Sequence, residues 1–190
     1  PMARYQAGLR TEARITESTR ELLGEVGLEA TTLKAICDRA GVRAGSFYNL
    51  FDSKEEVVLR VVGEAIAAVD PDPEGRNTDT VADLVEAYIS FIADQSTAAK
   101  IYLQIAVSGA IKDGTLGKRV FRHHELRTAR FTDALLRQRP DLERDEAEAR
   151  TEVLLATLNG LAFRWMLDPA FDFGSHARRA AFSPAIAPGG

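Results

Sequence analysis

Apolar residues in the first 40 positions recur with the spacing of amphipathic helices, and glycine interrupts them twice. The spacing predicts a first helix over 9–26, and Gly27 followed by an apolar residue is typical of a helix end. A second helix is predicted directly after Thr31–Thr32, one of which is expected to cap it. That helix should end at Gly41, which is again followed by an apolar residue.

A third, short helix is predicted over 44–51. Its apolar residues Phe47 and Phe51 lie one turn apart, so we expect them to pack against the two preceding helices. Ser53 is followed three residues later by Glu56, which is the pattern of a capping box. The pattern predicts that a longer helix begins here.

The segment 70–75 contains two prolines, a glycine and three acidic residues, which predict a break. We therefore expect a helix-turn-helix domain over 1–53, a connecting helix over 54–69 and a second domain over 76–184. Helices of the second domain are predicted over 78–94, 97–111, 115–139, 141–167 and 175–182. No segment alternates apolar and polar residues as a half-buried strand does, so the predicted fold class is all-α.

Length and composition are those of an ordinary globular protein. The chain has 190 residues, 45% of them hydrophobic and 27% charged. It has one cysteine, no apolar run of the ~18 residues that a membrane span needs, and no basic-then-apolar leader, so we expect a cytoplasmic protein without a membrane partner. The net charge is −4, and the first 54 residues carry eight Lys/Arg against seven Asp/Glu, so charge alone does not indicate nucleic acid.

The third predicted helix carries polar side chains on the faces that do not pack. These are Ser46, Tyr48 and Asn49, and Arg43 lies just before the helix. Asn can pair bidentately with adenine, Arg with guanine or phosphate, and Ser with a base edge or a phosphate. Lys54 lies at a predicted helix N-terminus, whose free amides favour a phosphate. Two helices joined by a glycine turn form a helix-turn-helix pattern.

Each of these residues also has a plain structural explanation. Tyr48 could be half-buried core, Asn49 a solvated helix residue, and Lys54 part of a surface charge run with the two glutamates that follow it. Their occurrence in one register favours DNA binding over these explanations.

The stretch TTLKAICDRAGVRAGSFYNLFDSKEEVV, residues 31–58, resembles the DNA-binding signature of the TetR family of bacterial transcriptional regulators. The matching features are the two threonines, the apolar second helix, Ala-Gly-Val, the Gly-Ser step, Tyr followed three residues later by Phe, and Ser-Lys-Glu. The resemblance covers about 10–62, and the remaining chain matches in length and helical layout.

The resemblance implies DNA contacts at eight positions. Phosphate contacts are implied for Thr32, Tyr48 and Lys54, contacts at or near base edges for Arg43, Ala44, Ser46 and Asn49, and an occasional contact of either kind for Lys34. Leu50 stands where the family often has His, and its apolar side chain cannot make the polar backbone contact that some members make there.

The resemblance also implies a small-molecule effector site in the second domain. Segment 97–111 is apolar on nearly every face, which predicts a helix buried on all sides. Plain core remains the alternative for each residue expected to line the site: Tyr88, Phe91, Tyr102, Ile105, Phe121, Phe131 and Trp165. We expect a largely hydrophobic effector, and the sequence does not name it.

A homodimer is expected on two grounds. One short recognition helix reads few base pairs, whereas a two-fold pair reads two half-sites ~34 Å apart. Segment 141–167 has an apolar stripe and a mid-helix glycine, which suggests close backbone approach, and with 115–139 it resembles the intersubunit four-helix bundle of the family. The expected interface residues are Leu154, Leu158, Gly160 and Leu161.

No catalytic residue, metal site or cofactor is predicted. His123 and His124 are adjacent and therefore about 100° apart on a helix, which does not make an i, i+4 metal pair. Cys37 lies on the apolar face of a short helix, where an inert core residue is expected. We interpret the chain as a ligand-responsive transcriptional regulator, in the family's commoner mode a repressor, that binds a palindromic operator as a dimer. The alternative is a helical small-molecule-binding protein or enzyme whose helix-turn-helix segment is only structural.

Overall fold

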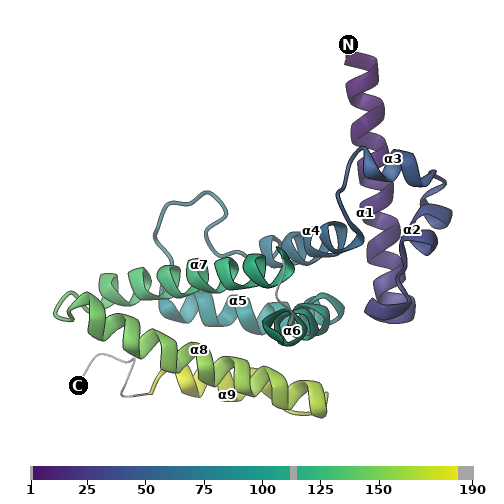
Figure 1. Cartoon of the computed structure of the whole chain (residues 1–190). Coiled ribbons are helices and arrows are strands. Elements are labelled where there is room, and N and C mark those ends of the chain that lie inside the picture. Colours follow the sequence, from purple (N-terminus) through teal and green to yellow (C-terminus); the bar gives the residue numbers. More distant parts are fainter. Residues whose placement is uncertain (1, 112–114, 184–190) are drawn as a thin grey trace. The chain divides into compact units, whose positions relative to one another are not determined.

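The computed structural model describes residues 2–111 and 115–183 (Figure 1). Within these ranges the chain is all-α, with nine helices and no strand, as the sequence predicts. Contacts between Cα atoms divide it into two compact units. Unit 1 holds the described residues up to Ile66 together with Thr97–Tyr102, and unit 2 holds Ala67–Ser96 and the described residues from Leu103 onwards.

This division differs from the expected domain limits. The connecting helix predicted over 54–69 belongs to unit 1 almost to its end, and residues 97–102, expected in the second domain, also belong to unit 1. The proline-containing segment 70–75 lies inside unit 2. The predicted limits of the functional domains stay a prediction.

Helix α1 spans Met2–Ala30 and therefore begins earlier than predicted. Gly27 kinks it, with φ 80° and ψ −179°, in the left-handed range of φ that favours glycine. The kink is held by Thr31, whose N–H and hydroxyl both donate to the Gly27 carbonyl, at 3.2 and 2.6 Å. The predicted interruption at Gly27 is confirmed.

Helix α2 spans Leu33–Ala40 and has local signals at both ends. Thr32 is the N-cap, and its hydroxyl oxygen accepts a hydrogen bond from the Ala35 N–H at 3.1 Å. Gly41 ends the helix with φ 64° and ψ 38°. The predicted limits of this helix are confirmed. They could be predicted because the residues that cap the helix are adjacent to it in the sequence.

Helix α3 spans Ala44–Tyr48 and ends before position 51, where the prediction placed its end. Helix α4 spans Lys54–Ala67. Ser53 Oγ accepts from the Glu56 N–H at 3.2 Å, and the Glu56 carboxylate accepts from the Asp52 N–H at 2.6 Å. The predicted cap is therefore present, with the glutamate reaching one residue further back than in the usual capping box.

An apolar cluster holds α1, α2, α3 and the start of α4 together. Its buried members are Ile15, Leu22, Ile36, Cys37, Ala40, Phe47, Phe51 and Val57. Phe47 is completely buried, and its ring centroid lies 5.6 Å from that of Phe51. Fully burying such a side chain contributes about 1.5–3 kcal/mol, so these two rings fix α3 against its neighbours.

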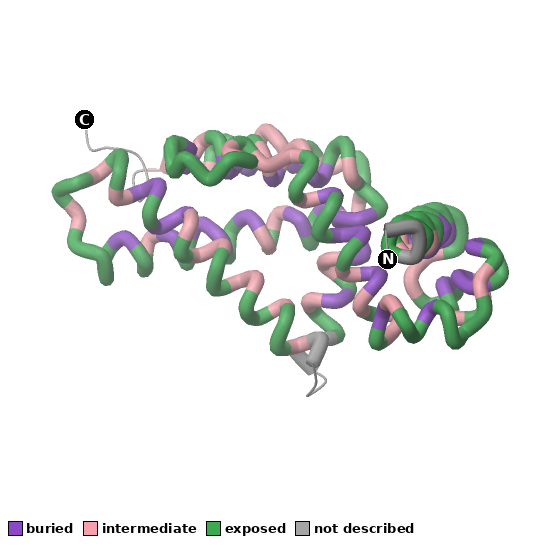
Figure 2. Tube along the Cα trace, turned by 90° about the horizontal axis from the view of Figure 1, so that it is seen from above, coloured by how far each residue is buried: buried purple, intermediate pink, exposed green. Residues whose placement is uncertain are grey.

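Unit 2 contains α5 (Val81–Asp94), α7 (Thr115–Gln138), α8 (Arg144–Leu167) and α9 (Phe173–Ala181). Helix α7 packs on α8 and α5, and α9 packs on α5 and α8. Buried positions recur at intervals along these helices, with exposed positions between them (Figure 2). The core therefore runs along the inside of a helical bundle.

Helix α6 spans Ser96–Ile111, and its expected burial on all sides is wrong. Ile101 and Ile105 are buried, whereas Val107 is 61% exposed and Gln104 is also exposed. Some apolar residues of α6, such as Val107, therefore lie on a side of the helix that this chain leaves exposed.

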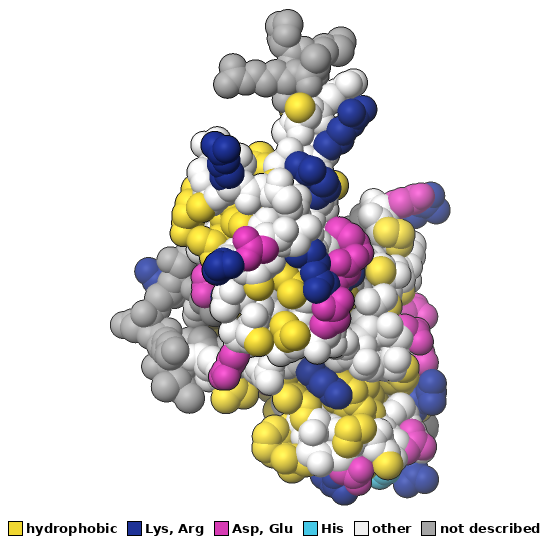
Figure 3. All heavy atoms as spheres, turned by 90° about the vertical axis from the view of Figure 1, so that its right-hand side faces the viewer, with side chains coloured by type: hydrophobic (Ala, Val, Ile, Leu, Met, Phe, Trp, Pro, Cys, Tyr) yellow, Lys and Arg dark blue, Asp and Glu magenta, His cyan; other side chains and the backbone are white. Residues whose placement is uncertain are grey.

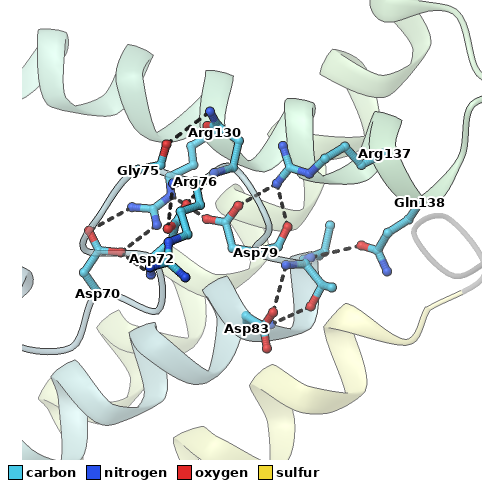
Figure 4. Close-up of polar contacts among 12 residues, drawn as sticks. Asp70, Asp72, Gly75, Arg76, Asp79, Asp83, Arg130, Arg137 and Gln138 are labelled. Atoms are coloured by element: carbon cyan, nitrogen blue, oxygen red, sulfur yellow. Dashed lines mark hydrogen bonds and ion pairs between the residues drawn. The ribbon is translucent and has the colours of Figure 1, made fainter.

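The segment before α5 is held to α7 by two arginines (Figure 4). Arg130 donates through Nε to Asp79 at 2.7 Å and through Nη2 to Asp70 at 2.6 Å. Arg137 donates through Nη2 to the Asp79 carboxylate at 2.5 Å. The Asp79 side chain is only 3% exposed, so two guanidinium groups compensate one buried charge. We call Asp70, Asp79, Arg130 and Arg137 the linker clamp.

Candidate nucleic-acid interface and effector site

The buried side of α3 determines which of its residues face outward. Phe47 is 0% and Phe51 2% exposed, whereas Tyr48 is 56% exposed. The Tyr48 ring packs edge-on against Phe47, with centroids 5.6 Å apart and an interplanar angle of 88°. Tyr48 therefore packs on Phe47 with one edge, while more than half of its surface is open to a contact.

The residues predicted to lie near base edges are all exposed. Arg43 is the N-cap of α3, Ala44 and Ser46 lie within the helix, and Asn49 is its C-cap; all four are exposed. A Cβ atom added at Gly45, between them, would meet no other atom within 4 Å. The short helix thus presents small and planar polar groups to solvent, beside the exposed Tyr48.

Two predicted phosphate contacts are free to bind an anion. The exposed Thr32 hydroxyl accepts a hydrogen bond from the Ala35 N–H, so its own proton remains available to donate. Lys54 is the first residue of α4, where the helix dipole favours negative charge. Neither Lys54 nor Arg43 takes part in an ion pair among the described residues.

Lys34 is different, because it already has an acidic partner. Its Nζ lies 2.5 Å from Asp38 Oδ2, and the two side chains are 85% and 65% exposed. The hydrogen bond to Asp38 raises the pKa of Lys34. An exposed i, i+4 pair is weak, so a phosphate can compete for this ammonium group.

Three other arginines of unit 1 are engaged with acidic residues. Arg39 bonds to Glu25 at 2.6 Å, Arg20 pairs with Glu17 and Glu64, and Arg60 pairs with Glu12. On the face shown in Figure 3, the Lys and Arg side chains are spread among acidic and apolar ones. The interface would therefore depend on the placement of a few cations more than on bulk charge.

The structure separates the residues expected to line an effector site. Those buried in unit 2 are Tyr88, Phe91, Ile105, Phe131 and Trp165. Phe121 is 61% exposed, so the described chain does not bury it beside the others, and its part in an effector site stays a prediction. Tyr102 is half-buried and belongs to unit 1.

A polar group that the sequence did not indicate lies among these residues. The Arg127 guanidinium carbon stands 4.4 Å from the centroid of the Tyr88 ring and 5.8 Å from that of Phe131. Asn159 Oδ1 accepts from Arg127 Nη1 at 3.2 Å and lies 3.4 Å from the Tyr88 hydroxyl. Three helices of unit 2 thus converge on one guanidinium group. Their spacing in the chain gives no signal of this.

The expected dimer residues lie on two different sides of α8. Leu154 and Leu158 are 3% and 0% exposed, so their assignment to a surface for a second copy is wrong, because this chain's own core covers them. Leu161 is half-buried. Gly160 is exposed, and a Cβ atom there would meet nothing within 4 Å.

Other kinds of site find no support among the residues that the structure describes. No group of three or more His, Cys, Asp or Glu side chains there is placed to hold a metal ion. None of the described helices is both long and apolar enough to cross a membrane. Cys37 is buried, and burial raises the pKa of its thiol, which disfavours the reactive thiolate.

Residues 15–61 match the family model described as bacterial regulatory proteins, tetR family. The HTH-type transcriptional repressor KstR2 of Rhodococcus jostii (strain RHA1) is 45% identical over 57 residues. That match covers 30% of this chain and 27% of the repressor, so it spans little more than a quarter of the relative's length.

Two solved structures are similar over nearly the whole chain. SmeT, the repressor of the Stenotrophomonas maltophilia multidrug efflux pump SmeDEF, has a TM-score of 0.68 at 22% identity, covering 94% of each chain. Thermus thermophilus FadR, a TetR-family repressor in complex with lauroyl-CoA, has a TM-score of 0.65 at 21% identity, covering 94% of this chain and 100% of that one. At these identities the likeness establishes the fold.

Proposed function

We propose that the chain, whose residues 15–61 match the tetR family model, is a cytoplasmic transcriptional repressor that binds a palindromic operator as a homodimer and is released by a small, largely hydrophobic effector. The observation that carries the proposal is the outer surface of α3. Arg43, Ser46, Tyr48 and Asn49 are exposed there, while the fully buried Phe47 holds the helix from behind.

The proposed DNA contacts follow from the chemistry of this surface. Arg43, Ser46 and Asn49 supply donors and acceptors for base edges, and the small Ala44 side chain can approach a thymine methyl. Phosphates would be bound by Thr32, Tyr48 and Lys54, with Lys34 as a further contact after release from Asp38.

The proposed dimer uses the outer side of α8. Exposed apolar or small residues follow one another there at alternating steps of four and three: Ala149, Val153, Ala156, Gly160, Phe163 and Leu167. This is the spacing of a helix–helix seam. Gly160 would let a second helix approach closely, since no atom of this chain fills the space beside it.

The proposed release mechanism runs through α7. This helix carries Phe131 of the expected effector site and, next to it, Arg130 of the linker clamp. Asp70, which Arg130 binds, follows the end of α4 by three residues. An effector that moves α7 would therefore pull on the chain just after α4 and change the spacing of the two DNA-binding heads from the ~34 Å that adjacent half-sites need.

The DNA-binding proposal is tested by selecting duplexes from a randomised pool with the wild-type protein and measuring their affinity by fluorescence anisotropy. Tyr48→Phe and Lys54→Ala should weaken binding to all sequences alike, and Lys54→Ala should lower the salt slope by about 2 per dimer. Lys118→Ala, an exposed lysine on α7, is the matched control and should change nothing. Failure to enrich any duplex would refute the proposal and favour a helical binding protein without DNA.

The dimer proposal is tested by sedimentation. Phe163, 58% exposed on the outer side of α8, becomes a charged group in Phe163→Glu, which should shift the protein toward monomer and weaken operator binding. Val26→Glu is the control, because Val26 is similarly exposed but lies on α1. A dimer that survives both Phe163→Glu and Gly160→Leu would place the interface elsewhere.

A further inference from the structure

Arg127 has an unusual environment for a charged side chain. It lies on α7 inside unit 2, and its Nη2 atom is buried without a hydrogen-bond partner. No ion pair among the described residues involves Arg127. Leaving a buried charged donor unsatisfied is costly, so such a group in a folded protein requires an explanation.

The neighbours of Arg127 orient the guanidinium but do not neutralise it. Its Cζ atom lies over the Tyr88 ring and, at a greater distance, over the Phe131 ring. Asn159 Oδ1 is an uncharged acceptor for Nη1. The Tyr88 ring is itself held edge-on by Phe173 of α9, with centroids 5.3 Å apart. Helices α5, α7, α8 and α9 therefore all contribute to fixing this one cation.

Other basic residues neighbour Arg127 along α7. The pKa of His123, one turn before Arg127 on α7, is lowered by burial first and then by the charges of Arg127 and His124. The next arginine on the helix, Arg130, has both its carboxylate partners in the linker clamp. Arg127, in contrast, has no carboxylate partner among the described residues. Its neighbours Tyr88 and Phe131 are two of the residues expected to line the effector site.

We infer that Arg127 binds an anionic group of the effector, a carboxylate or a phosphate, whose apolar body lies among the aromatic residues of unit 2. The anion accepts hydrogen bonds from Nη2. A guanidinium group presents several N–H donors in one plane, which match the oxygens of a carboxylate or a phosphate better than a single acceptor atom. The Tyr88 and Phe131 rings and Asn159 hold the guanidinium group in place. The inference rests on the proposed function and specifies the chemical class of its effector.

The test uses the single tryptophan, Trp165, which is buried on α8 in the same unit. Its fluorescence is titrated with decanoate, decyl phosphate and decanol, which share an apolar chain and differ in the head group. Wild-type protein should prefer one or both anions to the alcohol, and the anion that binds tighter identifies the head group. Thermal shift with the same three probes is the second readout.

Arg127→Met should lower affinity for the preferred anion about 10- to 100-fold and leave that for decanol unchanged, because only a charge-assisted hydrogen bond is lost. Arg127→Lys should restore part of the preference. Arg122→Met, an exposed arginine on the same helix, should match wild type.

Equal affinity for the anions and decanol, an anion preference that persists in Arg127→Met, or no stabilisation by either anion would each overturn the inference. Operator binding by the wild-type protein is measured separately. If that binding is present and the anion preference absent, the inference alone fails; if operator binding is absent, the proposed function fails.

Discussion

The linker clamp allows a quantitative prediction. Arg130→Met removes a guanidinium that bonds to two carboxylates, Asp79 at 2.7 Å and Asp70 at 2.6 Å, and keeps most of the side chain's apolar length. Asp79 is then left with Arg137 as its cationic partner, while its side chain remains only 3% exposed.

The expected cost follows from these exposures. Removing the sole partner of a buried charge typically costs about 3–5 kcal/mol. Asp79 keeps Arg137, and the Arg130 side chain is 38% exposed, so solvent already screens part of the interaction. We therefore expect a loss of about 2 kcal/mol in unfolding free energy, which in a chain of this length lowers Tm by about 4–8 °C.

The assay is thermal and urea denaturation followed by circular dichroism. Arg76→Met is the matched control, because Arg76 lies in the same linker, is 71% exposed and pairs with the exposed Glu74. It should change the unfolding free energy by less than about 0.5 kcal/mol.

The pH dependence provides an independent check. Hydrogen bonding from Arg130 lowers the pKa of Asp70 in the folded protein. This stabilisation is present above the unfolded pKa of about 3.9 and is lost as pH falls through the lower folded value, so the gap between wild type and Arg130→Met should narrow below about pH 4. The assignment of Arg130 as a stabilising partner of Asp70 and Asp79 would be refuted in either of two cases. In one, Arg130→Met lowers the unfolding free energy no more than Arg76→Met does; in the other, its effect does not change with pH through this range.

Three further predictions concern single positions. Gly45→Ala should keep or slightly raise stability, because the added Cβ meets no atom of this chain, yet weaken operator binding in anisotropy if the α3 backbone approaches DNA closely. Phe47→Ala should lower the unfolding free energy by about 3–5 kcal/mol in urea, far more than Tyr48→Ala, since Phe47 is fully buried and Tyr48 is 56% exposed. Stability should fall as pH drops below about 6.5, because the lowered pKa of His123 makes the unfolded chain take up the proton first; His123→Gln should flatten this dependence.

The helix-turn-helix could be predicted closely because its signals are local. The cap at Thr32, the left-handed Gly41 and the cap at Ser53 each depend on residues within four positions, and all three are confirmed. The extension of α1 back to Met2 was missed, since the first residues carry no start signal that distinguishes them from a frayed end.

The second unit was harder because its determinants are distant in the chain. Helix α8 has apolar residues on both sides, so periodicity could not show whether Leu154 or Val153 faces the chain's own core. The bond from Arg130 to Asp79 joins residues 51 positions apart, and Tyr88 and Asn159 are 71 apart. Only the packing of the helices brings such pairs together.

The central claim is that the outer surface of α3 reads base edges. It is tested most directly by measuring, for wild type and Asn49→Ala, the affinity for the selected operator and for duplexes that change each base pair in turn. We predict that Asn49→Ala loses about 1–3 kcal/mol of discrimination at one position in each half-site and keeps it at the others. Unchanged discrimination at every position would contradict the account.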